Sequence, residues 1–105
     1  MNLKMDLGKE GLLMFFKDYQ IKALEALWDS GVGLSSREVW EAVGENEISR
    51  ASIINFLDDA VKNGLLKVTQ ITGKGGHRGI FTPVFDEKGT KKYLAKIFKE
   101  RLDAL

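Results

Sequence analysis

The hydrophobic pattern of the chain changes its period at Leu65. Before this position, apolar residues recur every three or four places, as they do in helices that bury one face. The clearest helical segment covers residues 49–63, with Ser49 as a candidate N-cap and Gly64 as the stop. After it, LKVTQIT alternates and is rich in β-branched residues, and a second strand-like run, GIFTPVF, follows a glycine-rich loop. The pattern predicts a mainly α fold of the α+β class, with helices followed by a small β-hairpin.

Two further helical segments precede residues 49–63. The first covers residues 18–30 and ends before Gly31. The second opens with Ser35 and Glu38, which have the spacing of a capping box. Three capped helices followed by a hairpin is the order of a winged helix-turn-helix domain, in which the third helix enters the major groove of DNA and the hairpin forms the wing.

A chain of 105 residues has the size of one small domain. We expect an N-terminal segment at 1–17 as a candidate dimer contact, a winged helix-turn-helix domain at 18–85, and an amphipathic dimerisation helix at 86–105. The longest apolar run, Leu12 to Phe16, is too short to cross a bilayer or to serve as a signal sequence. Because the chain has no cysteine, disulfides and thiolate chemistry are excluded, and we expect a cytoplasmic protein without a membrane partner.

The net charge is only +1, but the charges are distributed unevenly along the chain. Residues 60–85 contain no acidic residue and carry Lys62, Lys67, Lys74 and Arg78. The positive field is therefore centred on the glycine-rich loop ITGKGGHRGIF. A local field of this kind favours a polyanionic partner, and we predict double-stranded DNA.

Nucleotide-binding glycine motifs do not fit this loop. A Walker A motif has Ser or Thr after its lysine, but Gly75 follows Lys74, and a strand rather than a helix comes next. The dinucleotide fingerprint also fails, because Arg78 stands where the third glycine belongs. Two interpretations remain: a plain flexible turn, or a tip at 73–79 whose Lys74, His77 and Arg78 contact DNA phosphates. The single histidine has no second histidine or cysteine to share a metal, so we expect no metal and no cofactor.

The outward face of the 49–63 helix offers polar groups near its start. With Ile53 directed inward, the exposed side can donate to phosphates, bond base edges or touch a thymine methyl group. Arg50 is nearer the core edge, but its long side chain can reach forward from the first turn. The candidate DNA contacts at this end of the helix are Ser49, Arg50, Ala51, Ser52 and Asn55. Asp58 and Asp59 would repel phosphates unless only the first two turns enter the groove, and the alternative is a merely solvated face. Because adjacent helix positions point about 100° apart, the two carboxylates do not form an acid–base pair, and we expect no enzyme.

Over about residues 16–105, the stretches ALEALWDSGVGLSSREVWEAV, SRASIINFLDDAVKNGLL and GIFTPVF follow an order that resembles the penicillinase-repressor (BlaI/MecI) family of winged-helix regulators. The resemblance implies a homodimeric repressor on a palindromic operator, with Arg50, Ser52 and Asn55 contacting bases or phosphates. It also implies dimer contacts in the C-terminal helix. These are Leu94, Ile97, Phe98 and Leu102. The short C-terminal tail and the long wing tip depart from the family pattern.

We therefore expect a sequence-specific DNA-binding transcriptional regulator, with the helix at 49–63 in the major groove and the wing at 67–85 on flanking phosphates. The alternative is a winged-helix module that binds another protein and no DNA. The near-neutral net charge and the pair Asp58 and Asp59 favour this alternative.

Overall fold

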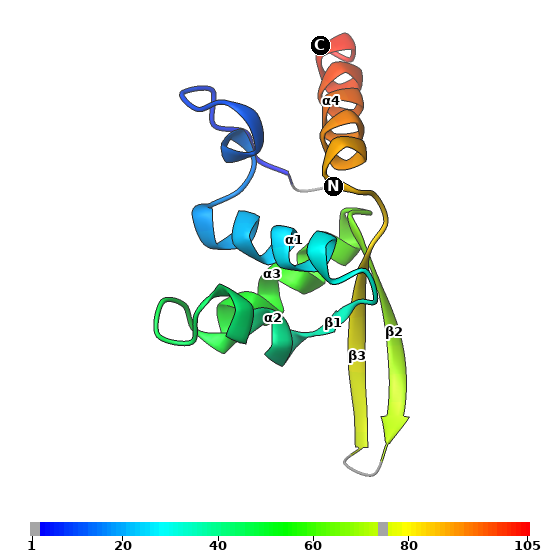
Figure 1. Ribbon diagram of the computed structural model, residues 1–105. Helices are drawn as coiled ribbons and strands as arrows, with labels where there is room; N and C mark the ends of the chain where they lie inside the picture. The colour runs from blue at the N-terminus through cyan, green and yellow to red at the C-terminus, as the bar shows by residue number, and fades with distance from the viewer. Residues whose placement is uncertain (1–2, 74–75) are drawn as a thin grey trace.

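The computed structural model describes residues 3–73 and 76–105 of the chain. The elements, in chain order, are the 3-10 helix η1 (Gly11–Met14), α1 (Asp18–Ser30), β1 (Leu34–Ser35), α2 (Ser36–Val43), α3 (Arg50–Lys62), β2 (Leu66–Gly73), β3 (Gly76–Pro83) and α4 (Glu87–Asp103). Figure 1 shows α1, α2 and α3 grouped into a body, from which the β2–β3 hairpin projects at one end and α4 at the other. The described part of the chain thus has four α-helices and one antiparallel sheet, which confirms the predicted α+β class.

The sheet has the antiparallel order β1-β3-β2. β2 and β3 pair along their whole length, from Leu66 opposite Pro83 to Gly73 opposite Gly76. The short β1, at 34–35, pairs with the other side of β3. The sequence pattern does not predict β1, because a strand of two residues carries no periodicity.

Gly33 lets β1 approach β3 closely. Its φ is +89°, and a Cβ at this position would lie 2.8 Å from Ile80 Cγ2 and 3.0 Å from the Phe81 carbonyl oxygen. Any other residue would need a rare backbone conformation and would also push β3 away. Gly33 therefore sets how near the start of α2 lies to the sheet.

The prediction of a loop at 73–79 is wrong for most of these residues, because Gly73 and residues 76–79 belong to strands. β3 begins at Gly76, and Ile71 pairs with Arg78 inside the ladder. Cross-strand backbone hydrogen bonds stabilise the extended conformation here, although glycine has a low β-propensity. Lys74 lies outside the described residues.

The N-terminal segment, from Leu3 on, lies against α4. α4 begins at Glu87, and Oδ1 of its N-cap residue Asp86 accepts the N–H of Gly89 at 2.6 Å. The later turns of α4 project from the body, and the N-terminal segment returns to them, where the Leu3 carbonyl accepts a hydrogen bond from Arg101 Nη1 at 3.1 Å. Across residues 3–73 and 76–105, no helix combines the length and the apolar character needed to span a bilayer.

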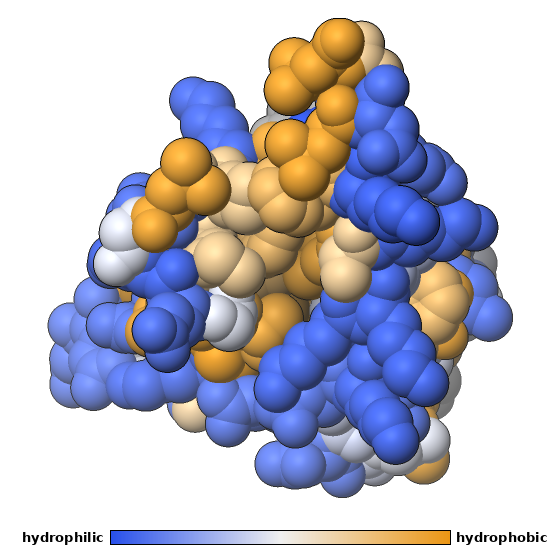
Figure 2. Space-filling view, turned by 90° about the horizontal axis from the view of Figure 1, so that it is seen from above, coloured by the Kyte–Doolittle hydropathy of each residue, from blue (hydrophilic) through white to orange (hydrophobic). Residues whose placement is uncertain are grey.

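Two apolar hollows of about 270 and 290 Å³ lie between the N-terminal segment and α4. They share Met5, Phe15 and Phe98 in their walls, and we call them together the terminal trough. Figure 2, which views the molecule from the end where α4 projects, shows hydrophobic side chains in a hollow with hydrophilic ones around it. Leu102 and Leu105 also line this trough, and they are 49 % and 99 % exposed.

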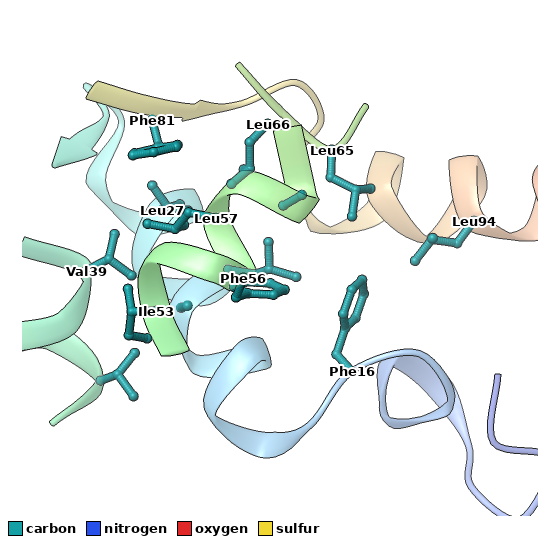
Figure 3. Packing of buried hydrophobic residues seen from close by; sticks show 14 residues of the cluster. Phe16, Leu27, Val39, Ile53, Phe56, Leu57, Leu65, Leu66, Phe81 and Leu94 are labelled. Atoms are coloured by element: carbon teal, nitrogen blue, oxygen red, sulfur yellow. The ribbon is translucent and has the colours of Figure 1, made fainter. Parts of the chain in front are cut away.

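The hydrophobic core joins α1, α2, α3, the sheet and α4 (Figure 3). Its buried apolar residues are Phe16, Ala23, Leu24, Leu27, Val39, Val43, Ile53, Phe56, Leu57, Ala60, Leu65, Leu66, Phe81 and Leu94. Leu94 is 2 % exposed within the single chain, so its implied role as a dimer contact is wrong: the first turns of α4 cover the chain's own core. Trp28 and Trp40 lie half-buried at the core edge, where their indole N–H groups donate to the carbonyls of Phe85 (3.1 Å) and Ile48 (2.8 Å).

Candidate nucleic-acid interface

α3 begins at Arg50 with Ser49 as its N-cap, where the sequence predicts a helix start. The Ser49 hydroxyl oxygen accepts the N–H of Ser52 at 3.1 Å, and the two hydroxyl oxygens lie 2.8 Å apart. One hydroxyl proton is used within this pair, so the two serines together can offer one further O–H donor. The helix cap therefore uses part of the hydrogen-bonding capacity of Ser49 and Ser52 that the sequence analysis assigns to DNA contacts.

The exposed side of α3 is the side that the hydrophobic period predicts. Ile53 is fully buried and lies in the core. Arg50, Ala51 and Asn55 are exposed, and Ser52 is half-buried. The first two turns of α3 therefore present polar and small side chains to solvent.

A groove of about 450 Å³ lies between α3, the start of α2 and the hairpin. Its lining residues are Ser35, Ser36, Arg37, Arg50, Ile54, Asp58, Val68, Gln70, Arg78, Gly79 and Phe81. Three of them are arginines, one each from α2, α3 and β3, and we call this surface the arginine groove. A concave surface with guanidinium groups on separate elements can contact several phosphates of one nucleic-acid backbone.

Arg78 reaches the groove from a stretch of β3 that has a partner strand on one side only. β1 pairs with β3 at Ile80 and Phe81, whereas Arg78 pairs with β2 alone. The electrostatics agree with this position. The backbone N–H of Ser35 donates to Glu38 Oε1 at 3.0 Å and lowers the pKa of that carboxyl, the Ser35 hydroxyl lowers it further, and the charge of Arg78 makes a smaller contribution in the same direction. This direction is consistent with the guanidinium of Arg78 facing the start of α2 across the groove.

Arg37 lines the groove but is absent from the candidates drawn from the sequence. Its signal is its place in the first turn of a capped helix, SSREV, where backbone N–H groups also point outward and can bind an anion. Arg37 Nε donates to Glu41 Oε1 at 3.0 Å in an exposed i,i+4 ion pair, so part of its charge is used locally.

Ile54 and Gln70 are also groove residues that sequence reasoning misses. Ile54 is 37 % exposed and would pass as a core residue in a helical pattern. Neither residue gives a signal in the sequence, because its exposure depends on how far the hairpin stands from α3.

Asp58 lines the same groove and brings negative charge into it. It stands eight residues after Arg50, which corresponds to about 12 Å along a helix axis. Asn55 lies about 100° around the helix from Ile54, on the outer side of α3. The start of α3 is thus the cationic end of the groove, and its second half is the acidic end.

Two of the candidate wing residues cannot be placed. Lys74 is outside the described residues, and so is the side chain of His77, whose backbone pairs with Thr72. Of the predicted wing contacts, Arg78 alone has a described side chain, and it lies in the arginine groove. Within the described part of the chain, no group of three or more His, Asp or Glu side chains could hold a metal ion.

A scan against protein-family models gave no match, and a search of curated proteins found no related sequence.

Proposed function

We propose that the chain is a winged helix-turn-helix regulator that binds double-stranded DNA. The observation that carries this proposal is the arginine groove, where Arg37, Arg50 and Arg78 come together from α2, α3 and β3. The succession of α1, β1, α2, α3, β2 and β3, with the sheet order β1-β3-β2, supports the winged-helix assignment. The lack of acidic residues from 60 to 85 supports a polyanionic partner.

In this proposal, the first two turns of α3 enter the major groove. Asn55 is exposed on the outer side of the helix and has the amide needed for a bidentate contact with adenine. Ala51 is exposed beside it and fits against a thymine methyl group. Arg37, Arg50 and Arg78 contact phosphates, and Asp58 stays clear of the backbone because α3 tilts out of the groove toward its end.

The experiment that tests DNA binding is a titration of labelled duplex of mixed sequence at several salt concentrations. Contacts with phosphates release counterions, so each should add about −0.9 to the slope of log K against log salt concentration. With the three groove arginines of one chain engaged, the slope should be about −2.7 per chain. The absence of any salt-dependent binding would refute the proposal.

We propose further that the regulator acts as a homodimer joined through the terminal trough. Ile97 and Phe98 are half-buried and Leu102 is half-exposed on a helix that projects from the body, so a second copy can cover them. A two-fold dimer would present two α3 helices to half-sites about one turn of DNA apart. Light scattering should give twice the chain mass of 11.8 kDa, and a monomer at micromolar concentration would refute the dimer.

The resemblance to the penicillinase-repressor family points to repression. A reporter gene under the control of a selected operator tests this directly.

The second candidate function is a winged-helix module that binds another protein. Asp58 inside the arginine groove favours it, because a mixed-charge groove can pair with the mixed charges of a protein surface. The salt titration separates the two candidates, since a protein-binding module gives no steep slope with DNA.

A further inference from the structure

We propose that the cavity between the N-terminal segment and α3 binds a small organic anion with an apolar body. The cavity has a volume of about 510 Å³, within the range of about 300–1,000 Å³ typical of small-molecule sites. It shares no lining residue with the arginine groove. The proposal therefore stands apart from DNA binding and goes beyond it. We call this space the N-terminal cavity.

The floor of the N-terminal cavity is apolar and well packed. Phe16 and Phe56 meet edge to face, with ring centroids 6.0 Å apart, and both are buried. Ala60 and Leu65 continue this surface, and Figure 3 shows the Phe16 ring beside Phe56 and directed toward Leu65. A buried aromatic surface that also lines an open cavity suits the hydrocarbon or aromatic part of a ligand.

The mouth of the cavity is cationic on the side of the N-terminal segment. Lys4, Lys9 and Lys17 all line it and are exposed. The ion pairs found among the described residues are those of Lys22 with Glu47 and of Arg37 with Glu41, so none of the three lysines is engaged in one. Three ammonium groups around one opening favour a carboxylate or a similar anionic group.

Asp6 and Asp59 also line the cavity, so the three lysines exceed the two carboxylates by one positive charge. Asp6 Oδ1 accepts the N–H of Gly8 at 2.9 Å and so stabilises its own loop. Asp59 lies on α3, across the cavity from the N-terminal segment, where Asn63 also lines the wall. The cavity is therefore polarised: a bound anion would direct its charge to the lysines and its apolar body to the phenylalanines.

The position of the cavity connects it to α3. Asp59 lines the N-terminal cavity and Asp58 lines the arginine groove, so the two spaces flank the same helix on different sides. A ligand in the cavity would touch α3 through Phe56 and Asp59. If α3 reads DNA as proposed, such a ligand would lie against the helix that carries the base contacts.

The test uses phenylpropionate and octanoate as anionic probes and phenylpropionamide as the neutral counterpart. Two-dimensional NMR of the full chain should show shifts that grow with probe concentration and cluster at Phe56, Asp59 and Asn63. The amide should bind about tenfold more weakly than the acid, the equivalent of one charged contact of about 1.4 kcal/mol. Equal binding of the acid and the amide would overturn the anionic class. The absence of clustered shifts for both acids at about 10 mM, well above the 1 mM constant of a weak ligand, would overturn the site.

Two variants with equal charge change complete the test. Replacing Lys4, Lys9 and Lys17 by glutamine should abolish the preference for the acid over the amide. The control replaces three exposed lysines of α4 that do not line the cavity. These are Lys88, Lys92 and Lys96. All six side chains are exposed, so we expect both variants to fold. The two-dimensional NMR spectrum of each variant without a probe checks this. An equal loss in both variants would show a general effect of net charge and would overturn the proposal.

Discussion

Replacing Arg78 by glutamine tests the arginine groove most directly. Arg78 is exposed and pairs with β2 through its backbone, so the substitution removes a charge and leaves the ladder in place. Lys67→Gln is the matched control, because Lys67 is an exposed cation of the same hairpin that does not line the groove.

The expected magnitude follows from the number of arginines. Three groove arginines per chain give six phosphate contacts in a dimer, and at about 0.9 per contact the slope of log K against log salt is about −5.4. Arg78→Gln removes two of the six contacts and should reduce the slope to about −3.6. Between about 50 and 200 mM salt, affinity should then fall about 1,800-fold for the wild type and about 150-fold for the variant.

Fluorescence anisotropy with one labelled duplex, repeated at several salt concentrations, measures these slopes. Lys67→Gln should keep the wild-type slope, since its charge lies away from the groove. If Arg78→Gln keeps the wild-type slope, or if the two variants lose the same amount, the groove is not where DNA phosphates bind.

Four other outcomes are expected. Asn55→Ala should relax the preference at one base position by about 1–3 kcal/mol and leave the salt slope unchanged, as measured on a set of single-base operator variants. Gly33→Ala should lower the free energy of unfolding in urea by more than Gly31→Ala, because both have positive φ but only position 33 has atoms within 3.0 Å of the new Cβ; positive φ alone costs about 1–2 kcal/mol. The lowered pKa of Glu38 contributes stability that is present above its ordinary value of 4.5 and is lost as the pH falls below it, so Glu38→Gln should reduce the loss of stability between neutral pH and about pH 3 in urea titrations. Leu102→Glu should shift the mass measured by light scattering toward a single chain, because a charge would enter the trough through which we propose that the dimer forms.

Each of these outcomes has a clear opposite. An unchanged base preference in Asn55→Ala would mean that residues of α3 other than Asn55 contact the bases. Equal destabilisation at positions 31 and 33 would mean that the approach of β1 to β3 does not limit stability. A wild-type pH profile in Glu38→Gln would show that its bond with Ser35 is absent in solution, and an unchanged mass in Leu102→Glu would remove the trough from the dimer.

Local signals in the sequence predict the helices of this chain well. Ser35 and Ser49 each bond to the backbone N–H three residues later, so these two helix starts are determined within a single turn. β1 and the full length of the hairpin depend instead on partner strands from other parts of the chain. The residues of β1 and of the glycine-rich stretch contain no pattern that predicts which strands they pair with.

The candidate site divides in the same way. The exposure of Ala51 and Asn55 follows from the period of one helix and is predicted, whereas Ile54 and Gln70 become groove residues only through the distance between α3 and the hairpin. Leu94 illustrates the limit at the C-terminus. An apolar stripe on a helix shows that something covers it, but not whether the cover is the same chain or a second copy, and for Leu94 it is the same chain.

The hairpin and α4 leave the body at opposite ends of a molecule 51 Å long. No residue of the arginine groove belongs to the terminal trough. If the chain binds DNA as the proposed two-fold assembly through the trough, the angle and length of α4 set the separation of the two half-sites, while α3 sets their base sequence. Mutation could therefore change operator spacing and operator sequence independently, and new targets could arise by altering one property at a time.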